Sequence, residues 1–220
     1  MTRDSIELPI LAAATNAIVT AKLFAGISDG NLERYRTKWL PILKERRSKA
    51  IQMRREGKLV RMVEDAHWDW SKKVAAERAA SLVYQSFALE CEEETQGLML
   101  LEFTHRSRIS PPQHLVYIDY LSVAPWNRPW LDEPQIFKGI GPVLVRHAVG
   151  TSIREGFQGR IGLHSLPGAV DFYTRIKMTS FGADPNYHNL NYFEFSIEQA
   201  NEFLSEKNQK KEDRKEERHV

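Results

Sequence analysis

Hydrophobic and polar residues along this chain repeat with two periods, and the changes between them divide the sequence into strands and helices. Residues 17–25 alternate, as a strand with one buried face does. Residues 32–56 have helical spacing, although Pro41 is expected to kink or divide that helix near Leu40. Gly57 is the residue type that commonly ends a helix. The chain is therefore predicted to open with a strand and a helical segment.

The middle of the chain changes from helical to strand spacing near residue 83. Residues 66–82 are alanine-rich and amphipathic, which predicts a second helix opened by Trp68 and Trp70. Strand character follows in three stretches, residues 83–91, 96–105 and 115–123. The acidic residues 92–95 predict a hairpin tip, so the first two of these strands should be antiparallel neighbours.

The rest of the chain alternates between helices and strands. Residues 140–156 predict an amphipathic helix whose buried face consists of Ile140, Val143, Leu144, Ala148 and Ile153. Further strands are expected at residues 160–166, 180–183 and 190–195, with a short helix at 169–176. Ser196 and Gln199 have the spacing of a capping box, which opens a C-terminal helix. Residues 206–220 are almost all charged and are predicted to be a disordered tail.

Together these elements predict an α+β fold. We expect a single domain, residues 1–205, with a central mixed β-sheet flanked by helices and followed by the charged tail. The helix at 140–156 connects two strands as a crossover, which allows those strands to be parallel. A hydrophobic content of 42% is ordinary for a globular protein with a buried core.

Composition excludes several classes of protein. The 31 basic and 29 acidic residues nearly cancel, so net charge does not indicate a partner. Cys91 is the only cysteine, which excludes a disulfide framework and a thiolate zinc site and fits a reducing, cytoplasmic compartment. The apolar run 8–26 contains Pro9 and Lys22 and is interpreted as a buried segment rather than a targeting or membrane segment.

One stretch is strongly basic. Residues 44–61 hold eight basic residues against two acidic ones, a composition that can bind nucleic acid. No aromatic residues are interleaved for base stacking, so we favour a solvated helix face and do not expect nucleic-acid binding. The inward side chains of that helix would be Ile42, Leu43, Ile51 and Met53.

A glycine-bearing turn precedes the helix at 140–156. The turn reads Lys138-Gly139-Ile140-Gly141, and a helix N-terminus with glycines can bind a pyrophosphate through its amides. The sequence contains neither a Walker loop nor a complete dinucleotide-binding fingerprint. An ordinary tight turn is the alternative interpretation of the two glycines.

Four pieces of the sequence resemble the acetyl-CoA-binding core of the GNAT superfamily of N-acetyltransferases. YIDYLSVAP is similar to the family's fourth strand, and FKGIGPVLVRHAV to its pyrophosphate loop and helix. RIGLHSL is similar to its fifth strand, and GAVDFYTRIKMTSFG to its tyrosine-bearing helix. The order and spacing agree over residues 83–195, so the resemblance implies an N-acyltransferase that uses acetyl-CoA as co-substrate.

The resemblance also implies which residues bind the cofactor. The backbone of Leu121, Ser122 and Val123 would pair with the pantetheine arm. The amides of Lys138, Gly139, Ile140, Gly141 and Val143 would hold the pyrophosphate, whereas Pro142 has no N–H to donate. Ser165 and Phe172 also fall within the cofactor-binding pieces.

Two residues are the catalytic candidates that the resemblance implies. Transfer proceeds by direct attack of an amine on the thioester, so the amine must lose a proton and the thiolate must gain one. Asp119 takes the position of the general base, and a structural carboxylate or a cation-binding group is its alternative role. Tyr173 takes the position of the acid that protonates the coenzyme A sulfur, and a core aromatic with a hydrogen-bonded hydroxyl is its alternative.

Several departures from the family pattern leave a second function open. Ile136 replaces the usual glutamine or arginine, Lys177 the usual glycine, and the loop 128–137 is longer and aromatic. The alternative to an enzyme is a non-catalytic module of the same fold that binds acyl-CoA or a protein.

The expected partners follow from these two hypotheses, an N-acyltransferase and a non-catalytic binding module. An enzyme would take a small-molecule amine or a protein amine as acceptor, and a homodimer is left open. No metal is expected, because the seven histidines show no ligand spacing. A hydrolase elbow is also excluded, because G-x-S-x-G is missing around His164 and Ser165.

Overall fold

The computed structural model describes residues 4–131 and 134–205 of the chain. These residues form two compact units, the first comprising the chain up to Glu102 together with Asp119–Val145. The second comprises Phe103–Ile118 and the described chain from Arg146 onward. Strand β5 (Val116–Val123) and helix α4 (Ile140–Arg154) each contribute to both units. The predicted tail, residues 206–220, lies outside the described residues.

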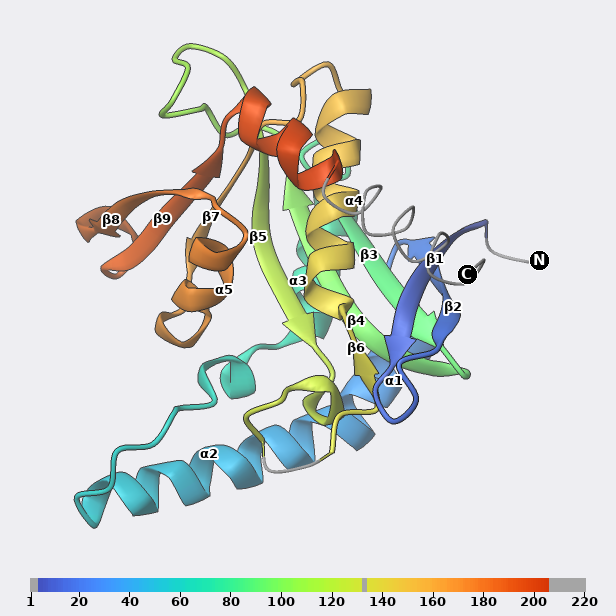
Figure 1. Cartoon of the computed structure of the whole chain (residues 1–220), viewed down its shortest axis with the longest axis vertical. Coiled ribbons are helices and arrows are strands. Elements are labelled where there is room, and N and C mark those ends of the chain that lie inside the picture. The colour runs from blue at the N-terminus through green and yellow to red at the C-terminus, as the bar shows by residue number, and fades with distance from the viewer. Residues whose placement is uncertain (1–3, 132–133, 206–220) are drawn as a thin grey trace, which may run out of the picture. The chain divides into compact units, whose positions relative to one another are not determined.

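The first unit contains the N-terminal hairpin, three helices and a further hairpin (Figure 1). Its elements are β1 (Ser5–Ala12), β2 (Ile18–Ala25), α1 (Asp29–Arg34), a π-helical segment (Tyr35–Trp39), α2 (Leu40–Arg55), a 3-10 turn (Glu64–His67), α3 (Trp70–Ala79), β3 (Tyr84–Cys91), β4 (Glu94–Glu102) and β6 (Phe137–Lys138). The predicted first strand is β2. The neighbouring β1 and the two-residue β6 were not predicted.

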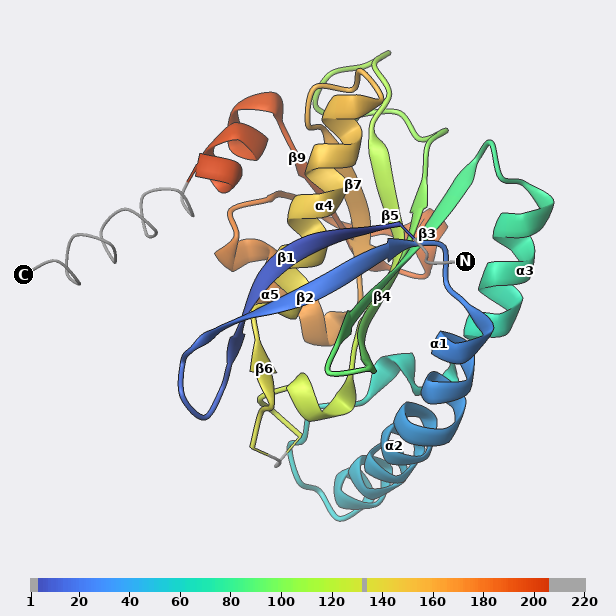
Figure 2. The same cartoon turned by 90° about the vertical axis from the view of Figure 1, so that its right-hand side faces the viewer.

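The strands of this unit pair as an antiparallel meander. β1 pairs with β2, β2 with β3 and β3 with β4, while β6 adds to the outer side of β1 (Figure 2). The predicted acidic hairpin is confirmed, but its turn is confined to Glu92 and Glu93, which have φ of 51° and 60°. Glu94 and Thr95 already belong to β4. In the order of hydrogen-bonded neighbours, all nine strands form one mixed sheet, β6-β1-β2-β3-β4-β5-β7-β9-β8.

The helical region does not break at Pro41; a π-helical segment, Tyr35–Trp39, precedes it instead. Proline has no N–H to donate, so the regular hydrogen-bond ladder is interrupted one turn before it. The Leu40 N–H instead reaches Tyr35 O, five residues back, and the chain continues into α2. Gly57, with φ of 77°, follows the end of α2 as predicted. The second predicted helix begins later than expected, at Trp70, because the Asp69 side chain caps it by accepting from Ser71 N and Lys72 N.

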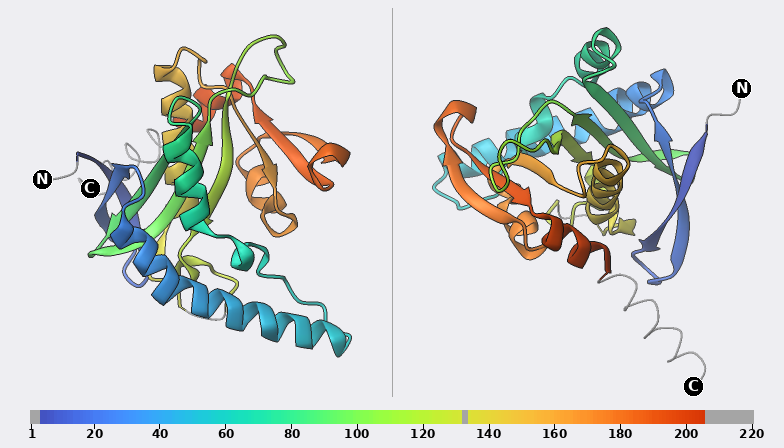
Figure 3. Two further views of the ribbon diagram at one scale, coloured as in Figure 1. Left: turned by 180° about the vertical axis from the view of Figure 1, so that it is seen from behind. Right: turned by 90° about the horizontal axis from the view of Figure 1, so that it is seen from above.

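The core of the first unit lies between its helices and strands β3–β5. Trp39, Leu43, Trp70, Leu98 and Leu100 are buried in one cluster there. Helix α3 and the first turns of α4 lie on opposite faces of β3 and β4 (Figure 3).

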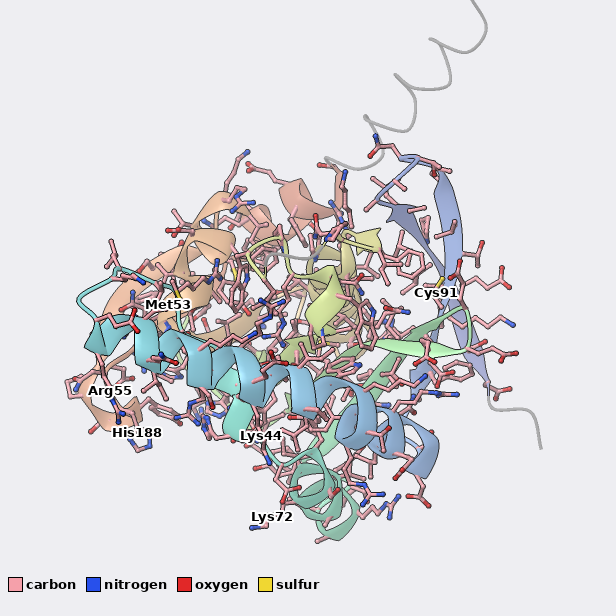
Figure 4. The ribbon with its side chains drawn as sticks, turned by 90° about the horizontal axis from the view of Figure 1, so that it is seen from below. Lys44, Met53, Arg55, Lys72, Cys91 and His188 are labelled. Atoms are coloured by element: carbon pink, nitrogen blue, oxygen red, sulfur yellow. The ribbon has the colours of Figure 1, made fainter. Side chains whose placement is uncertain are left out.

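The predicted inward face of α2 is wrong in its second half. Leu43 is buried, but Ile51 and Met53 are 36% and 38% exposed. The helix extends past the strands of its unit (Figure 1), and its last turn contacts the segment that follows it, where Arg54 Nη2 donates to Val60 O at 3.0 Å. The basic side chains of Lys44, near the start of α2, and of Arg55, at its end, are exposed to solvent as expected (Figure 4).

The described part of the second unit contains β7, β8 and β9, parts of β5 and α4, helix α5 and a final helix. β7 (Ile161–Ser165) pairs in parallel with β5, joining Val116 to Ile161, which confirms the predicted crossover. β9 (Leu190–Phe195) lies antiparallel between β7 and β8 (Thr179–Asp184), and α5 is Val170–Arg175. A final helix, residues 197–205, begins with the predicted capping box, in which the Gln199 N–H donates to Ser196 Oγ at 3.2 Å. No helix of the described chain is long and apolar enough to cross a membrane.

Helix α4 confirms most of its predicted buried face. Ile140, Val143, Leu144 and Ala148 are buried, but Ile153 is 46% exposed. The helix ends at Arg154, and Gly156 with φ of 79° follows it. Ile153 therefore lies in the last turn of α4, on a side that the sequence pattern had assigned to the core.

A buried ion pair joins three separate parts of the first unit. The Arg128 guanidinium donates to both carboxylate oxygens of Asp65, at 2.8 and 2.6 Å. It also donates to Val123 O at 2.8 Å, and Ser122 Oγ donates to Asp65 at 2.8 Å. Burial raises the pKa of Asp65, but the Arg128 charge and the hydrogen bonds from Arg128 and Ser122 lower it more. The carboxylate therefore stays ionised inside the unit.

Replacing Arg128 tests this pair. Arg128→Ala leaves Asp65 buried without its counter-charge, and we expect a loss of about 3–5 kcal/mol in the free energy of unfolding. Urea denaturation followed by circular dichroism measures it. The control is Arg55→Ala on the exposed end of α2, which should change stability by less than about 0.5 kcal/mol. Equal, small effects of both variants would show that the pair does not stabilise the fold.

Candidate functional site

The glycine turn connects β6 to α4 and is held in place from both sides. The Phe137 N–H donates to Asn127 Oδ1 at 2.8 Å, and Lys138 pairs with Leu11 of β1. Gly139 has φ of 87°, a conformation that favours glycine, and a Cβ built on it would meet no atom within 4 Å. The turn therefore leaves open space directly before the N-terminus of a 15-residue helix.

The amides at this helix end are fewer than the sequence suggested. The Val143 N–H donates to Gly139 O at 3.0 Å, so it is already used within the helix. Pro142 has no N–H, which leaves Ile140 and Gly141 as the first-turn amides without an intrahelical acceptor. The side chain of Lys138 is directed to Asn16 Oδ1, at 3.2 Å, rather than to the turn. An anion at this position would therefore be held by backbone donors and the helix dipole.

The end of β5 and the following loop are tied to the core of the first unit. Leu121 is half-buried, and the buried Ser122 donates its hydroxyl to Asp65. The Val123 carbonyl accepts a hydrogen bond from Arg128. Within the loop, Gln135 Nε2 donates to Asn127 O at 2.9 Å, and the Arg61 guanidinium lies 4.3 Å from the Trp130 ring centroid. One acceptor of the predicted pairing of the β5 backbone with a pantetheine arm, Val123 O, therefore already accepts one hydrogen bond from the ion pair.

Asp119 lies half-buried on β5 in a cluster of charged and aromatic side chains. Burial raises the pKa of Asp119, the Lys73 charge lowers it and the Glu102 charge raises it, and the net result is a pKa of about 6. The Lys73 ammonium lies 2.8 Å from the centroid of the Tyr120 ring. Burial lowers the pKa of Lys73 to about 8, against the charge of Asp119. A carboxyl group that titrates near pH 6 can accept a proton at neutral pH.

Lys73 was not among the predicted site residues. Its sequence neighbourhood, an alanine-rich helix with several charges, is typical of an exposed helix face. The paired aromatic rings of Trp68 and Tyr120, whose centroids are 4.9 Å apart, come from segments about fifty residues apart in sequence. The nearby Trp68 and Trp70 were the one available signal, and they were interpreted as the helix start.

In the second unit, the predicted acid Tyr173 lies on α5 and is 6% exposed. Its ring packs against Phe172 and Phe193, with centroids 5.0 and 5.7 Å away. Within the described chain its hydroxyl makes no hydrogen bond, and burial raises the pKa of Tyr173 above its usual value. The alternative role, a core aromatic with a hydrogen-bonded hydroxyl, therefore does not match this side chain. Ser165, at the end of β7, is buried and donates to Leu166 O at 2.9 Å.

The second unit also contains a buried polar network that the sequence did not reveal. The His164 ring accepts or donates at both nitrogens, with Tyr117 Oη 2.7 Å from Nδ1 and Asp184 Oδ2 3.1 Å from Nε2. Arg108 bonds Asp184 as well, and its hydrogen bond lowers the pKa of that carboxyl to about 2. Burial lowers the pKa of His164, so its ring is neutral at pH 7. The side chains of Tyr117, His164 and Asp184 are buried. Their hydrogen bonds therefore connect β5, β7 and β8 within this unit.

Other chemistries have no support in the part of the chain that the structure describes. No group of three or more histidine, cysteine, aspartate or glutamate side chains there is arranged to hold a metal ion. The predicted cofactor and base residues, Asp119, Leu121–Val123 and Lys138–Val143, fall in the first unit, whereas Ser165, Phe172 and Tyr173 fall in the second.

Comparison with known proteins identifies the fold. No protein-family model matches the chain, and no curated protein matches it in sequence. The solved structure of the GNAT domain of S. lividans PAT is similar, with a TM-score of 0.51 and 13% identity over 86% of this chain and 96% of that chain. A GNAT-family protein from Desulfovibrio desulfuricans has a TM-score of 0.50 and 10% identity over 80% of this chain and 99% of its own. The chain has the GNAT fold, and identity this low shows the fold alone.

Removing the Tyr173 hydroxyl tests whether it is unpaired. Tyr173→Phe removes a hydroxyl that makes no hydrogen bond within the described chain, so we expect the free energy of unfolding to change by less than about 1 kcal/mol. The matched control is Tyr192→Phe, because the buried Tyr192 hydroxyl donates to Glu194 at 2.9 Å. That variant should lose about 1–2 kcal/mol. Thermal and urea denaturation measure both, and a larger loss for Tyr173→Phe than for Tyr192→Phe would contradict the unpaired hydroxyl.

Proposed function

We propose that this protein is an acyl-CoA-dependent N-acyltransferase. It transfers an acetyl group from acetyl-CoA to an amine, which attacks the thioester directly. The GNAT fold supports this reaction class, and the observation that carries the proposal is Asp119. A half-buried carboxyl group whose pKa is near 6 matches the requirement for a general base at neutral pH.

The amine acceptor must lose a proton as it attacks. The ionised Asp119 carboxylate takes that proton, either directly or through one water molecule. Its surroundings also favour a cationic acceptor, because the carboxylate and the Tyr120 and Trp68 rings suit an ammonium group. The acceptor is therefore a primary amine on a small molecule or on a protein side chain.

The departing thiolate must gain a proton, and Tyr173 supplies it in this proposal. The Tyr173 hydroxyl makes no hydrogen bond within the described chain, so its proton is available for a new acceptor. The sulfur of coenzyme A would supply an acceptor for this hydroxyl. Because burial raises the pKa of Tyr173, the phenol stays protonated at neutral pH and is ready to donate.

The cofactor is held mainly by backbone. The amides of Ile140 and Gly141 and the N-terminus of α4 bind the pyrophosphate, and the open space beside Gly139 admits it. Leu121 and Ser122 provide the strand backbone for the pantetheine arm. The proposal includes a cytoplasmic location, which fits the buried, unpaired Cys91.

Binding of acetyl-CoA tests the glycine turn. Isothermal titration should detect acetyl-CoA binding to the wild-type protein, and Gly139→Val should weaken it at least about tenfold. Valine at a φ of 87° is strained by roughly 1–2 kcal/mol, so the turn must change shape. Gly182→Val is the control, since Gly182 on β8 is exposed and has φ of 75°. Absence of binding at millimolar acetyl-CoA would exclude this function.

The pH dependence of acetyl transfer tests the base. Asp119 accepts a proton only when ionised, so kcat/KM should rise with pH and reach half of its plateau near pH 6. Asp119→Asn should remove this limb and lower the rate about 10²–10⁴-fold. Glu7→Gln on β1, an exposed carboxylate, should leave the profile unchanged. A fold-intact Asp119→Asn variant with the wild-type rate and profile would favour the non-catalytic alternative.

A further inference from the structure

One amine of this chain lies over the ring of Tyr120, the neighbour of the proposed base in sequence, and interacts electrostatically with that base. Helix α3 begins at Trp70 under the Asp69 cap, which places Lys73 in its first turn, half-buried. The Lys73 ammonium lies 2.8 Å from the Tyr120 ring centroid and 5.3 Å from that of Trp68. These two rings meet edge to face, with centroids 4.9 Å apart. The pair of rings therefore holds an alkylammonium group in the way proposed above for the acceptor.

The charges around Lys73 support the same conclusion. Burial lowers its pKa to about 8, while Asp119 and Asp69 act in the opposite direction. Near pH 8, about half of the Lys73 side chains are then unprotonated. An ordinary lysine, with a pKa of about 10.4, would have roughly 0.4% free amine at that pH. Lys73 therefore presents a partly unprotonated amine over the ring of Tyr120, the residue after Asp119, and its charge interacts with the Asp119 carboxylate that would accept its proton.

We propose that Lys73 is an acyl acceptor within this chain, so that the protein acetylates its own Lys73 side chain from acetyl-CoA. This inference rests on the proposed function and names one substrate of that same site. In a direct-attack mechanism the acceptor amine must lie within reach of the general base. Lys73 is the lysine whose charge acts on the Asp119 carboxyl.

The chemical step needs no further reagent. The lone pair of Lys73 Nζ attacks the thioester carbonyl carbon, the N–C bond forms, and the C–S bond breaks with its electrons on sulfur. The attacking nitrogen loses one proton to Asp119, and the thiolate gains one from the general acid of the proposed reaction. The products are an N-acetyl-lysine side chain and free coenzyme A, and nothing is oxidised or reduced.

Acetylation of Lys73 would also change the site. The acetyl-lysine is neutral, so it loses its cation–π contact with Tyr120. The Lys73 charge lowers the pKa of Asp119, whereas burial and Glu102 raise it, so removing that charge raises the pKa further. The base would then stay protonated to higher pH, and transfer to external amines would slow at neutral pH. Self-acetylation is in this sense inhibitory.

Isotope labelling of the full-length chain tests the proposal. The protein is incubated with acetyl-CoA carrying a ¹³C-labelled acetyl group, and labelled lysines are quantified by peptide mass spectrometry over time. Lys73 should be labelled at least about tenfold faster than Lys72, the adjacent, exposed lysine of the same helix (Figure 4). The rate constant should not depend on protein concentration, because the acceptor belongs to the same molecule.

Three variants separate the possible outcomes. Asp119→Asn should slow the labelling of Lys73 at least about tenfold and leave Lys72 unchanged. Lys73→Arg should lose the fast label, and Lys72→Arg should retain it, with melting temperatures confirming that each variant is folded. If calorimetry shows acetyl-CoA binding while Lys73 is labelled no faster than Lys72, self-acetylation is wrong and the proposed function stands. If acetyl-CoA does not bind, both are wrong.

Discussion

The first unit depends on the buried ion pair of Asp65 and Arg128. An isolated charge in a protein interior is strongly destabilising, so each of these side chains constrains the position of the other. Asp65 precedes α3, which carries Lys73, and Arg128 follows β5, which carries Asp119. Because Arg128 also holds the Val123 carbonyl, the pair sets where β5 ends and where the loop toward the glycine turn begins. The same contact that stabilises the unit therefore positions its base and its amine.

Burial raises the pKa of both proposed proton-transfer groups, but their surroundings differ. Burial and Glu102 keep Asp119 protonated to a higher pH than an exposed aspartate, and the nearby Lys73 limits this effect so that the carboxyl can ionise at neutral pH. Tyr173 has no such counter-charge, and it stays protonated. The carboxyl is thus suited to accept a proton and the phenol to donate one, and burial brings the carboxyl pKa closer to neutral pH than the residue type alone would indicate.

Much of the fold could be predicted from periodicity, because strands and helices with one buried face carry a repeating signal. β2, β3, β5, β7 and β9 were found in this way. β6 has only two residues and pairs through backbone, so it leaves no pattern. Ile51 and Met53 were assigned inward wrongly, since an amphipathic pattern does not show where the packing surface ends.

Of the site, Gly139 and Tyr173 were named from motifs whose residues are close in sequence. Lys73 and the His164–Asp184 pair were not, because their partners are distant in sequence and meet only through the fold. The Val143 amide was assigned as a donor to the pyrophosphate, but it already donates to Gly139 O within the helix.

The most direct test of the account is the response of individual backbone amides to coenzyme A. In a ¹H–¹⁵N correlation spectrum, titration with acetyl-CoA should shift the amides of Gly139, Ile140 and Gly141 strongly, as new hydrogen bonds to the pyrophosphate form. The Val143 amide, already bonded to Gly139 O, should shift less. Unchanged amides at 139–141 with saturating acetyl-CoA would contradict the account.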